Sequence, residues 1–201
     1  MKNRLRRLWL PLALLLMTTC AQAFDLQQLD AQLSEPAVVR GDFIQQKHLR
    51  ALPQPLVSEG RFVLSRELGL LWLLQKPLQQ DYRINDAGVA LRNGEKWQPT
   101  GTQRAAAEYN KLFLAVLRGD SPALQQRFEL QLSGTPNAWQ LVLTPRSRLL
   151  QQIFTRILIT GGATAEQVEL FEAQGDSTSL SLKNLEIADE LSAEERHDLI
   201  H

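Results

Sequence analysis

From residue 38 onward, apolar positions recur mostly with a period of two, in short runs separated by Gly, Pro and Asn. Alternation predicts strands, and short runs spaced by turn residues predict an antiparallel meander. The first predicted strands are Val38 to Gln45, Gly60 to Leu64, Gly69 to Leu74, Asp81 to Asn85, Val89 to Leu91 and Lys96 to Gln98. The later ones are Phe128 to Leu132, Trp139 to Leu143, Ile153 to Thr160, Val168 to Ala173 and Thr178 to Ile187.

Helical patterns interrupt the meander in a few places. Phe24 to Leu33 and Ala105 to Leu117 carry apolar residues at helical spacing, and Ser121 to Arg127 predicts a short helical turn. Ser192 to Glu195 has the form of a capping box and begins a polar C-terminal helix or tail. We therefore expect an α+β, mainly β fold, with one curved antiparallel sheet. Such a sheet curls, and its concave face must be filled by side chains, a helix or a ligand.

One predicted strand does not alternate. Leu68 to Leu74 contains five Leu, one Trp and one Gly, with no polar residue. Two interpretations stay open: both faces of the strand are covered by protein, or one face lines an apolar cavity. Arg66 stands just ahead of this run. It is either an exposed arginine at the edge of an apolar region, or a latch whose guanidinium donates to backbone carbonyls of a helix across the sheet.

The first 23 residues differ from the rest of the chain. A basic start is followed by the apolar run Leu8 to Met17 and by Ala21-Gln22-Ala23, the pattern of a secretory signal cleaved after Ala23. Cleavage there removes Cys20, the one cysteine, so neither a disulfide nor a catalytic thiol is expected in the mature chain. Met17-Thr18-Thr19 before Cys20 also resembles a lipoprotein box, which leaves lipidation of Cys20 open.

Charge and composition narrow the function. The chain has 22 basic and 22 acidic residues; without residues 1–23 the balance is 18 to 22, a net charge of −4. This argues against nucleic acid or an anionic membrane surface as a partner. Residues 24–201 suit one domain. The histidines His48, His197 and His201 form no recognisable catalytic or zinc motif, so we expect no enzymatic activity, no cofactor and no metal site.

An ordered set of spacings resembles a known family. Its members are Phe43-x-Gln45, Gly60-x-Phe62, Arg66, Trp72, Pro77 and the turn Asp86-x-Gly88. Looser matches are Leu112-Phe113, Trp139-x-Leu141-x-Leu143-x-Pro145 and Gly175-Asp176. Together they resemble the LolA family of periplasmic outer-membrane lipoprotein carriers. The resemblance implies an incomplete antiparallel barrel closed by a helical lid around an apolar cavity for acyl chains, with Arg66 as the lid latch.

On this resemblance, we expect two sets of apolar residues at the site. The cavity lining is predicted to be Phe62, Leu64, Leu71, Trp72, Leu74, Leu130, Leu132, Trp139, Leu141, Phe154 and Ile157. The lid is predicted to be Leu29, Leu112, Phe113, Val116 and Leu117. Because a register slip of one residue reverses a strand, the inward face of each strand is the weakest part of this assignment.

The family's pattern is not complete in this chain. After Gly88 the sequence continues Val89 to Gly94, and a displaced Trp97-Gln98-Pro99 follows where the classical carriers have a Trp-x-Tyr-x-Pro strand. We therefore expect a divergent branch whose cargo is a lipoprotein or another lipid or polyene. The predicted function is a monomeric periplasmic carrier that receives cargo from an inner-membrane exporter and delivers it to an outer-membrane acceptor.

A rival hypothesis uses the same scaffold differently. The protein could be an envelope adaptor or sensor that binds a protein partner along the open edge of its sheet. A filled interior without a cavity would favour this second hypothesis.

Overall fold

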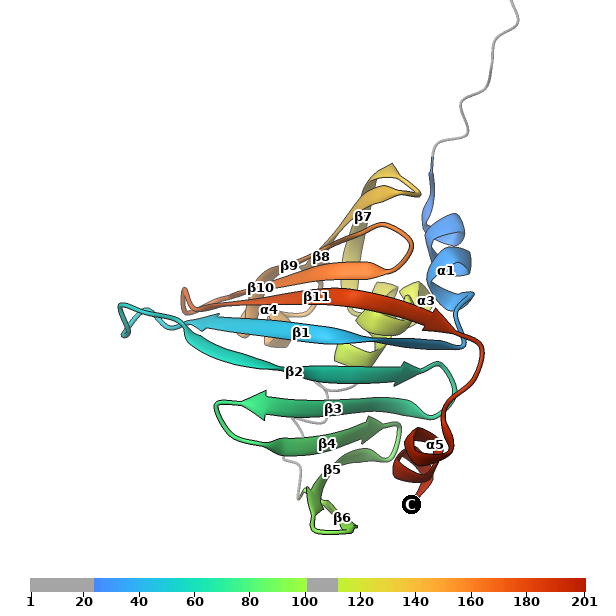
Figure 1. The fold of residues 1–201 in the computed structure, drawn as a ribbon. Coiled ribbons are helices and arrows are strands. Elements are labelled where there is room, and N and C mark those ends of the chain that lie inside the picture. Colours follow the sequence, from blue (N-terminus) through green and yellow to red (C-terminus); the bar gives the residue numbers. More distant parts are fainter. Residues whose placement is uncertain (1–23, 101–111) are drawn as a thin grey trace, which may run out of the picture.

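The structure is a computed structural model and describes residues 24–100 and 112–201. Its strands form one sheet in the order β6-β5-β4-β3-β2-β1-β11-β10-β9-β8-β7, antiparallel throughout (Figure 1). The strands are β1 Val38–His48, β2 Leu56–Ser65, β3 Gly69–Lys76, β4 Gln80–Asn85, β5 Gly88–Asn93, β6 Lys96–Pro99, β7 Phe128–Thr135, β8 Ala138–Pro145, β9 Phe154–Gly161, β10 Ala165–Glu172 and β11 Ser177–Ala188.

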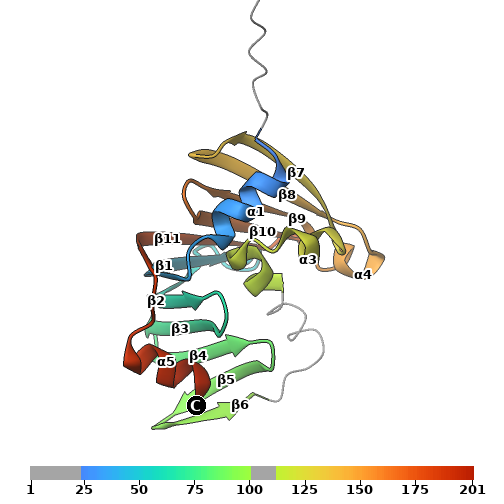
Figure 2. The same cartoon turned by 90° about the vertical axis from the view of Figure 1, so that its right-hand side faces the viewer.

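The predicted fold class is confirmed. Each strand expected from the alternation is present, although β1 and β2 run several residues further toward their shared loop than the pattern indicated. In the described residues, the outermost strands β6 and β7 pair with their single neighbours and not with each other. The sheet therefore curls without closing, as an incomplete barrel (Figure 2).

Five helical segments accompany the sheet in the described residues. They are α1 Leu26–Ser34, residues 112–118, α3 Ser121–Gln125, α4 Arg148–Gln151 and α5 Ala193–Ile200. Residues 105–111 of the predicted central helix lie outside the described residues, as do Cys20 and the expected cleavage site after Ala23. The sequence did not predict α4, a single turn capped by Ser147, because four residues are too few to show helical periodicity. In residues 24–100 and 112–201, no helix has the length and apolar character needed to span a bilayer.

The apolar run of β3 is covered on both faces. Leu70, Trp72 and Leu74 belong to the large core on the concave side, together with the helical segment 112–118. Leu71 packs on the opposite face with Val38, Val63 and Leu199 of α5. The prediction that Leu71 lines the cavity is therefore wrong. Because side chains alternate along a strand, Leu71 cannot share a face with Trp72.

Helix α5 is docked on the convex face, opposite α1 and α3 (Figure 2). The predicted capping box is present, with Ser192 and Glu195 bonded reciprocally. Glu195 also binds Arg40 of β1 through two contacts of 2.6 Å. At the other end of α5, Arg92 pairs with Asp198, and Arg83 donates to the Asp198 carbonyl at 3.1 Å. The predicted polar tail is thus a helix held at both ends.

Candidate functional site

The concave face carries one continuous apolar cluster that includes most of the predicted site. Among the lining candidates, Phe62, Leu64, Trp139, Leu141, Phe154 and Ile157 are buried in this cluster, and Trp72, Leu74, Leu130 and Leu132 are half-buried against it. Among the lid candidates, Leu29, Leu112, Val116 and Leu117 are buried in the same cluster, and Phe113 packs against it. The structure brings all of these residues together except Leu71. Their role in holding lipid remains a prediction.

Aromatic rings lie where the helical segment 112–118 meets the sheet. The ring of Trp72 stacks on Phe43 with centroids 3.6 Å apart, and Phe113 meets Trp72 edge-on at 5.5 Å. Phe62 lies 6.3 Å from Trp72. Such pairs contribute about 0.5–1.5 kcal/mol beyond the burial of their area. Phe113 is the one member of this group that comes from a predicted lid residue, so lid and sheet meet through ring contacts.

Phe43 is buried in the same concave cluster. It belongs to one of the sequence motifs but was not among the predicted lining residues. It lies opposite Gly60 in the β1–β2 register. A Cβ atom at Gly60 would come within 2.8 Å of the Phe43 ring and 2.2 Å of the Leu73 carbonyl oxygen. The absence of a side chain at Gly60 therefore leaves room for the Phe43 ring. The Gly60-x-Phe62 spacing was the signal that could have placed Phe43, because a glycine within a strand often marks a close approach.

Helix α1 lies across the concave face and is fixed at several points. Its N-terminus carries an Asp25–Gln28 capping box, and Leu29 at its centre is 1% exposed. The Gln32 side chain donates to the carbonyls of Gly162 and Pro136 at the far end of the sheet. Polar contacts of α1 are few, whereas its apolar side chains Leu26, Leu29 and Leu33 all pack in the concave cluster. Its attachment is therefore largely hydrophobic.

Asp30 is an unusual group in this attachment. One oxygen accepts a hydrogen bond from the Ser121 hydroxyl of α3, and the other, Oδ1, is buried without a partner among the described residues. Burial raises the pKa of the Asp30 carboxyl, and the bond from Ser121 opposes this shift. Burial therefore disfavours the ionised carboxylate in the folded protein, whereas the bond from Ser121 favours it.

Arg66 makes the contact expected of a latch. Its Nη1 donates to the carbonyl of Ser34, the last residue of α1, and its backbone nitrogen donates to the Ala37 carbonyl at 3.0 Å. The last carbonyls of a helix lack partners within the helix, and a cation there also matches the helix dipole. Arg66 itself is exposed. The contact can therefore form and break without burying or uncovering a charge.

Gly119 sets the distance between the two lid elements. It follows the helical segment 112–118 with a φ of +66°, and Asp120 N donates to the Ala115 carbonyl at 2.9 Å, as in a helix C-terminal turn. A Cβ atom at Gly119 would lie 2.4 Å from the Cβ of Leu33 in α1. Only glycine therefore allows both this turn and this close approach.

In the described residues, α1 and residues 112–118 pack closely against the concave face. Two hollows on this side have volumes of about 10 Å³, beside Leu29 and Trp139, and about 20 Å³, beside Phe62 and Leu117. Sites for small molecules typically measure about 300–1,000 Å³. Neither of these two hollows has room for an acyl chain while α1 and residues 112–118 lie on the concave face.

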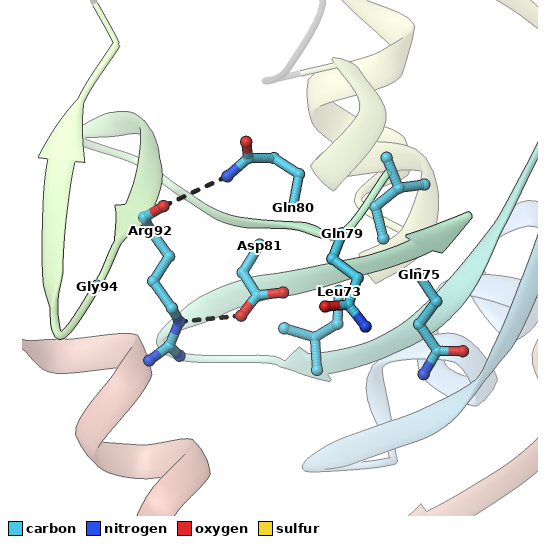
Figure 3. Close-up of a pocket in the computed structure, with 8 residues that line it drawn as sticks. Leu73, Gln75, Gln79, Gln80, Asp81, Arg92 and Gly94 are labelled. Atoms are coloured by element: carbon cyan, nitrogen blue, oxygen red, sulfur yellow. Dashed lines mark hydrogen bonds and ion pairs between the residues drawn. The ribbon is translucent and has the colours of Figure 1, made fainter. Parts of the chain in front are cut away.

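Larger hollows lie at the rim and are polar. One of about 370 Å³ opens between the β3–β4 and β5–β6 turns, where Arg92 pairs with Asp81 at 2.9 Å and Gln80 donates to the Arg92 carbonyl (Figure 3). Another of about 240 Å³ lies beside Arg66, between the end of α1 and the segment leading to α5. Charged and amide side chains line most of the first hollow, and charged side chains, with a few aliphatic ones, line the second, so neither suits an acyl chain.

A family model and a known relative of this chain are both described as outer-membrane lipoprotein carriers. The family model described as "Outer membrane lipoprotein carrier protein LolA-like" matches residues 18–193. An outer-membrane lipoprotein carrier protein of Ralstonia nicotianae is 29% identical over 180 residues, which cover 86% of this chain and 82% of that protein.

Two solved structures are also similar over most of the chain. A DUF1329 family protein from Desulfovibrio piger aligns with a TM-score of 0.49 and 12% identity, covering 88% of this chain and 97% of that one. A LolA superfamily protein from Nitrosomonas europaea aligns with a TM-score of 0.46 and 9% identity, covering 84% and 96%. The family match spans most of the sequence and confirms the resemblance seen in its motifs. This chain therefore belongs to the LolA-like family of outer membrane lipoprotein carrier proteins.

Proposed function

We propose that this protein is a periplasmic carrier that shields the acyl or other lipid-like chains of a lipoprotein or lipid in transit from the inner to the outer membrane. The observation that carries the proposal is the concave apolar cluster, covered by α1 and residues 112–118 rather than by a neighbouring strand. A face covered by short helices can be uncovered without breaking the sheet. The family match and the name of the Ralstonia nicotianae relative support the same function.

The energetics favour reversible binding. Each buried CH₂ contributes about 0.8 kcal/mol, so a chain of about fifteen methylenes gains roughly 12 kcal/mol on leaving water. Exposing the four buried lid residues Leu29, Leu112, Val116 and Leu117 costs about 1.5–3 kcal/mol each, which together is roughly 6–12 kcal/mol. The two quantities are comparable. Cargo that displaces the lid would therefore bind tightly enough to be shielded and weakly enough to be released.

The proposal extends to processing and partners. Residues 1–23 act as a signal that is cleaved after Ala23, and residues 24–201 form a single monomeric domain in the periplasm. An inner-membrane exporter and an outer-membrane acceptor contact it transiently. Transfer requires no bond to be made or broken, so the protein acts without enzymatic activity.

The close packing of the helices on the concave face favours a second candidate. With hollows of only about 10 and 20 Å³ behind the lid, the same fold could serve as an adaptor that binds a protein strand. The edge strand β7 has eight residues for such pairing, whereas β6 is short and ends at Pro99. The two candidates differ in whether the lid ever opens.

Native mass spectrometry of the protein purified from its own periplasm, with extraction of anything released, separates the candidates. A co-purifying acylated or polyene species supports the carrier and identifies its cargo. An unliganded mass, with no binding of a fluorescent fatty acid, supports the adaptor instead.

Two neighbouring leucines provide a matched pair of variants. Leu74 packs on the concave cluster and Leu73 on the convex one, and both are half-buried. We expect Leu74→Glu to reduce binding of a fluorescent fatty acid at least tenfold, because a carboxylate would face the chain. Leu73→Glu should bind nearly as wild type. Equal losses in two folded variants would contradict the assignment of the concave face.

A further inference from the structure

Exposed apolar side chains are concentrated at one end of the strands. In the described residues, six large exposed hydrophobics lie there: Leu52, Leu56, Val57, Leu78, Leu149 and Ile153. Leu78 and Leu149 are the most exposed, at 75% and 70%. Two others, Ile187 and Ile200, lie elsewhere, near the end of β11 and on α5. We call residues 49–57, 77–79, 146–153 and 173–176 the loop end.

Strand register places these segments at the same end. Because β1, β2, β3 and β4 are antiparallel neighbours, the β1–β2 loop and the β3–β4 turn leave the sheet on one side (Figure 1). His48 pairs with Ser177, so the β10–β11 turn is level with the start of the β1–β2 loop. Phe154 pairs with Glu172, which brings the segment from α4 to β9 to the same level. Residues more than 100 positions apart in sequence therefore share one end of the molecule.

Hydrogen bonds join the loops of this end. The backbone nitrogen of Arg50 donates to the Asp176 carboxylate at 2.9 Å, and its side chain donates to the Gln174 carbonyl. The backbone nitrogen of Ala173 donates to the Ile153 carbonyl at 2.9 Å. The β1–β2 loop, the β10–β11 turn and the segment after α4 are thus fixed to one another. On the other side, Lys76 of β3 pairs with Glu59 of β2.

Charge is segregated between the two ends of the strands. The loop end carries the exposed arginines Arg50, Arg146 and Arg148. Most acids nearby face a cation, since Asp176 is bonded to Arg50, Glu59 pairs with Lys76 and Glu172 pairs with Lys47. Glu95 in the β5–β6 turn and the exposed Glu129 near the start of β7 also lie at this end. At the opposite end, exposed acids follow α1, β2 and β11 and begin α5: Glu35, Glu67, Asp189, Glu190 and Glu194. They outnumber the exposed arginines Arg66 and Arg196 beside them. The net charge of the chain conceals this separation.

We propose that the loop end docks on an anionic phospholipid surface. Protruding aliphatic side chains flanked by arginines suit the boundary between head groups and acyl chains, where the leucines insert and the guanidinium groups bind phosphates. The acidic opposite end is repelled by the same surface, so charge orients the molecule. This reverses the expectation drawn from the net charge of −4. It also leaves α1 and the Arg66 latch at the end that points away from the bilayer.

Sedimentation with vesicles that carry no lipoprotein tests the docking. We expect the protein to bind vesicles of phosphatidylglycerol mixed with phosphatidylcholine, and to bind pure phosphatidylcholine at least fivefold more weakly. Replacing Leu52 and Leu78 together by Ser should lower the partition coefficient about tenfold, because both insertions are lost. The control, Ile187→Ser with Ile200→Ser, removes two exposed aliphatic side chains that lie away from the loop end. Its partition coefficient should stay within twofold of wild type.

A charge variant provides the second measurement. Arg148→Gln should weaken binding to anionic vesicles at low salt and lose this effect at high salt, because the attraction is screened. Arg196→Gln, on α5, should have no effect. Failure of the wild type to bind anionic vesicles, or equal losses in the control pair, would overturn the docking. That result would leave lipid carriage intact, because the fatty-acid assay tests carriage in the absence of any membrane surface.

Discussion

Removing the Arg66 latch should tighten lipid binding and slow its release. The side chain contributes a hydrogen bond from a charged donor to the Ser34 carbonyl in the closed state. Such bonds contribute about 1.5–3 kcal/mol when buried. Arg66 is exposed, so we reduce this to about 1 kcal/mol for screening by solvent. Losing about 1 kcal/mol of closed-state stability raises the open fraction roughly fivefold.

That shift can be measured as an affinity. The apparent dissociation constant equals the intrinsic one divided by the fraction of molecules that are competent to bind. If the open state is the competent one, Arg66→Leu should lower the apparent Kd for a fluorescent fatty acid about fivefold. Transfer of the bound lipid to acceptor vesicles should slow by a similar factor. The overall melting temperature should hardly change, because the rest of the lid packing remains.

A second arginine variant, Arg61→Leu, is the control for this experiment. Arg61, an exposed arginine on β2, lies away from α1, and Arg61→Leu should leave affinity and transfer unchanged. If Arg66→Leu folds normally and both quantities stay within twofold of wild type, the contact is not a latch. A change of the same size in Arg61→Leu would show that charge alone matters.

Three further predictions concern the helices. Gly119→Ala places a Cβ against Leu33 at a left-handed φ, which should cost about 2 kcal/mol and lower Tm by about 4–8 °C; an unchanged Tm would contradict the close approach. Hydrogen bonding from Arg40 lowers the pKa of Glu195, so this pair stabilises the fold above the ordinary carboxyl pKa and is lost as pH falls through the lowered one. Glu195→Gln should therefore lower Tm at pH 7 and match wild type in acid, as a series of melts against pH would show. Burial raises the pKa of Asp30, so ionisation destabilises the fold: Asp30→Asn should raise Tm at pH 7, with a gain that shrinks as pH falls below the carboxyl range.

Much of the fold was predictable because strand alternation and turn residues are local. The capping box at Ser192 and Glu195 was readable for the same reason, since a short spacing specifies both bonds. A contact between Arg66 and a helix carbonyl was one of two interpretations of its position beside an apolar run, and the sequence did not identify Ser34 as the acceptor.

The faces of the strands were harder to assign. Leu71 and Trp72 are equally apolar, and nothing in their own sequence says which one meets the lid. The assignment depends on Leu199, more than 100 residues away in sequence. Its helix α5 covers the convex face, where Leu199 packs against Leu71. A strand covered on both sides loses the alternation from which a face could be predicted.

The sequence by itself determined the strands of the described residues, the helices long enough to show a period, the family and most of the residues that gather in the concave apolar cluster. Tertiary structure alone decided three things: which face each strand buries, how closely the described helices pack on the concave face, and that exposed leucines and arginines share one end. These depend on contacts between segments far apart in the chain. The local sequence pattern specifies whether a segment is a strand or a helix. The curl of the whole sheet decides which distant side chains pack against that segment.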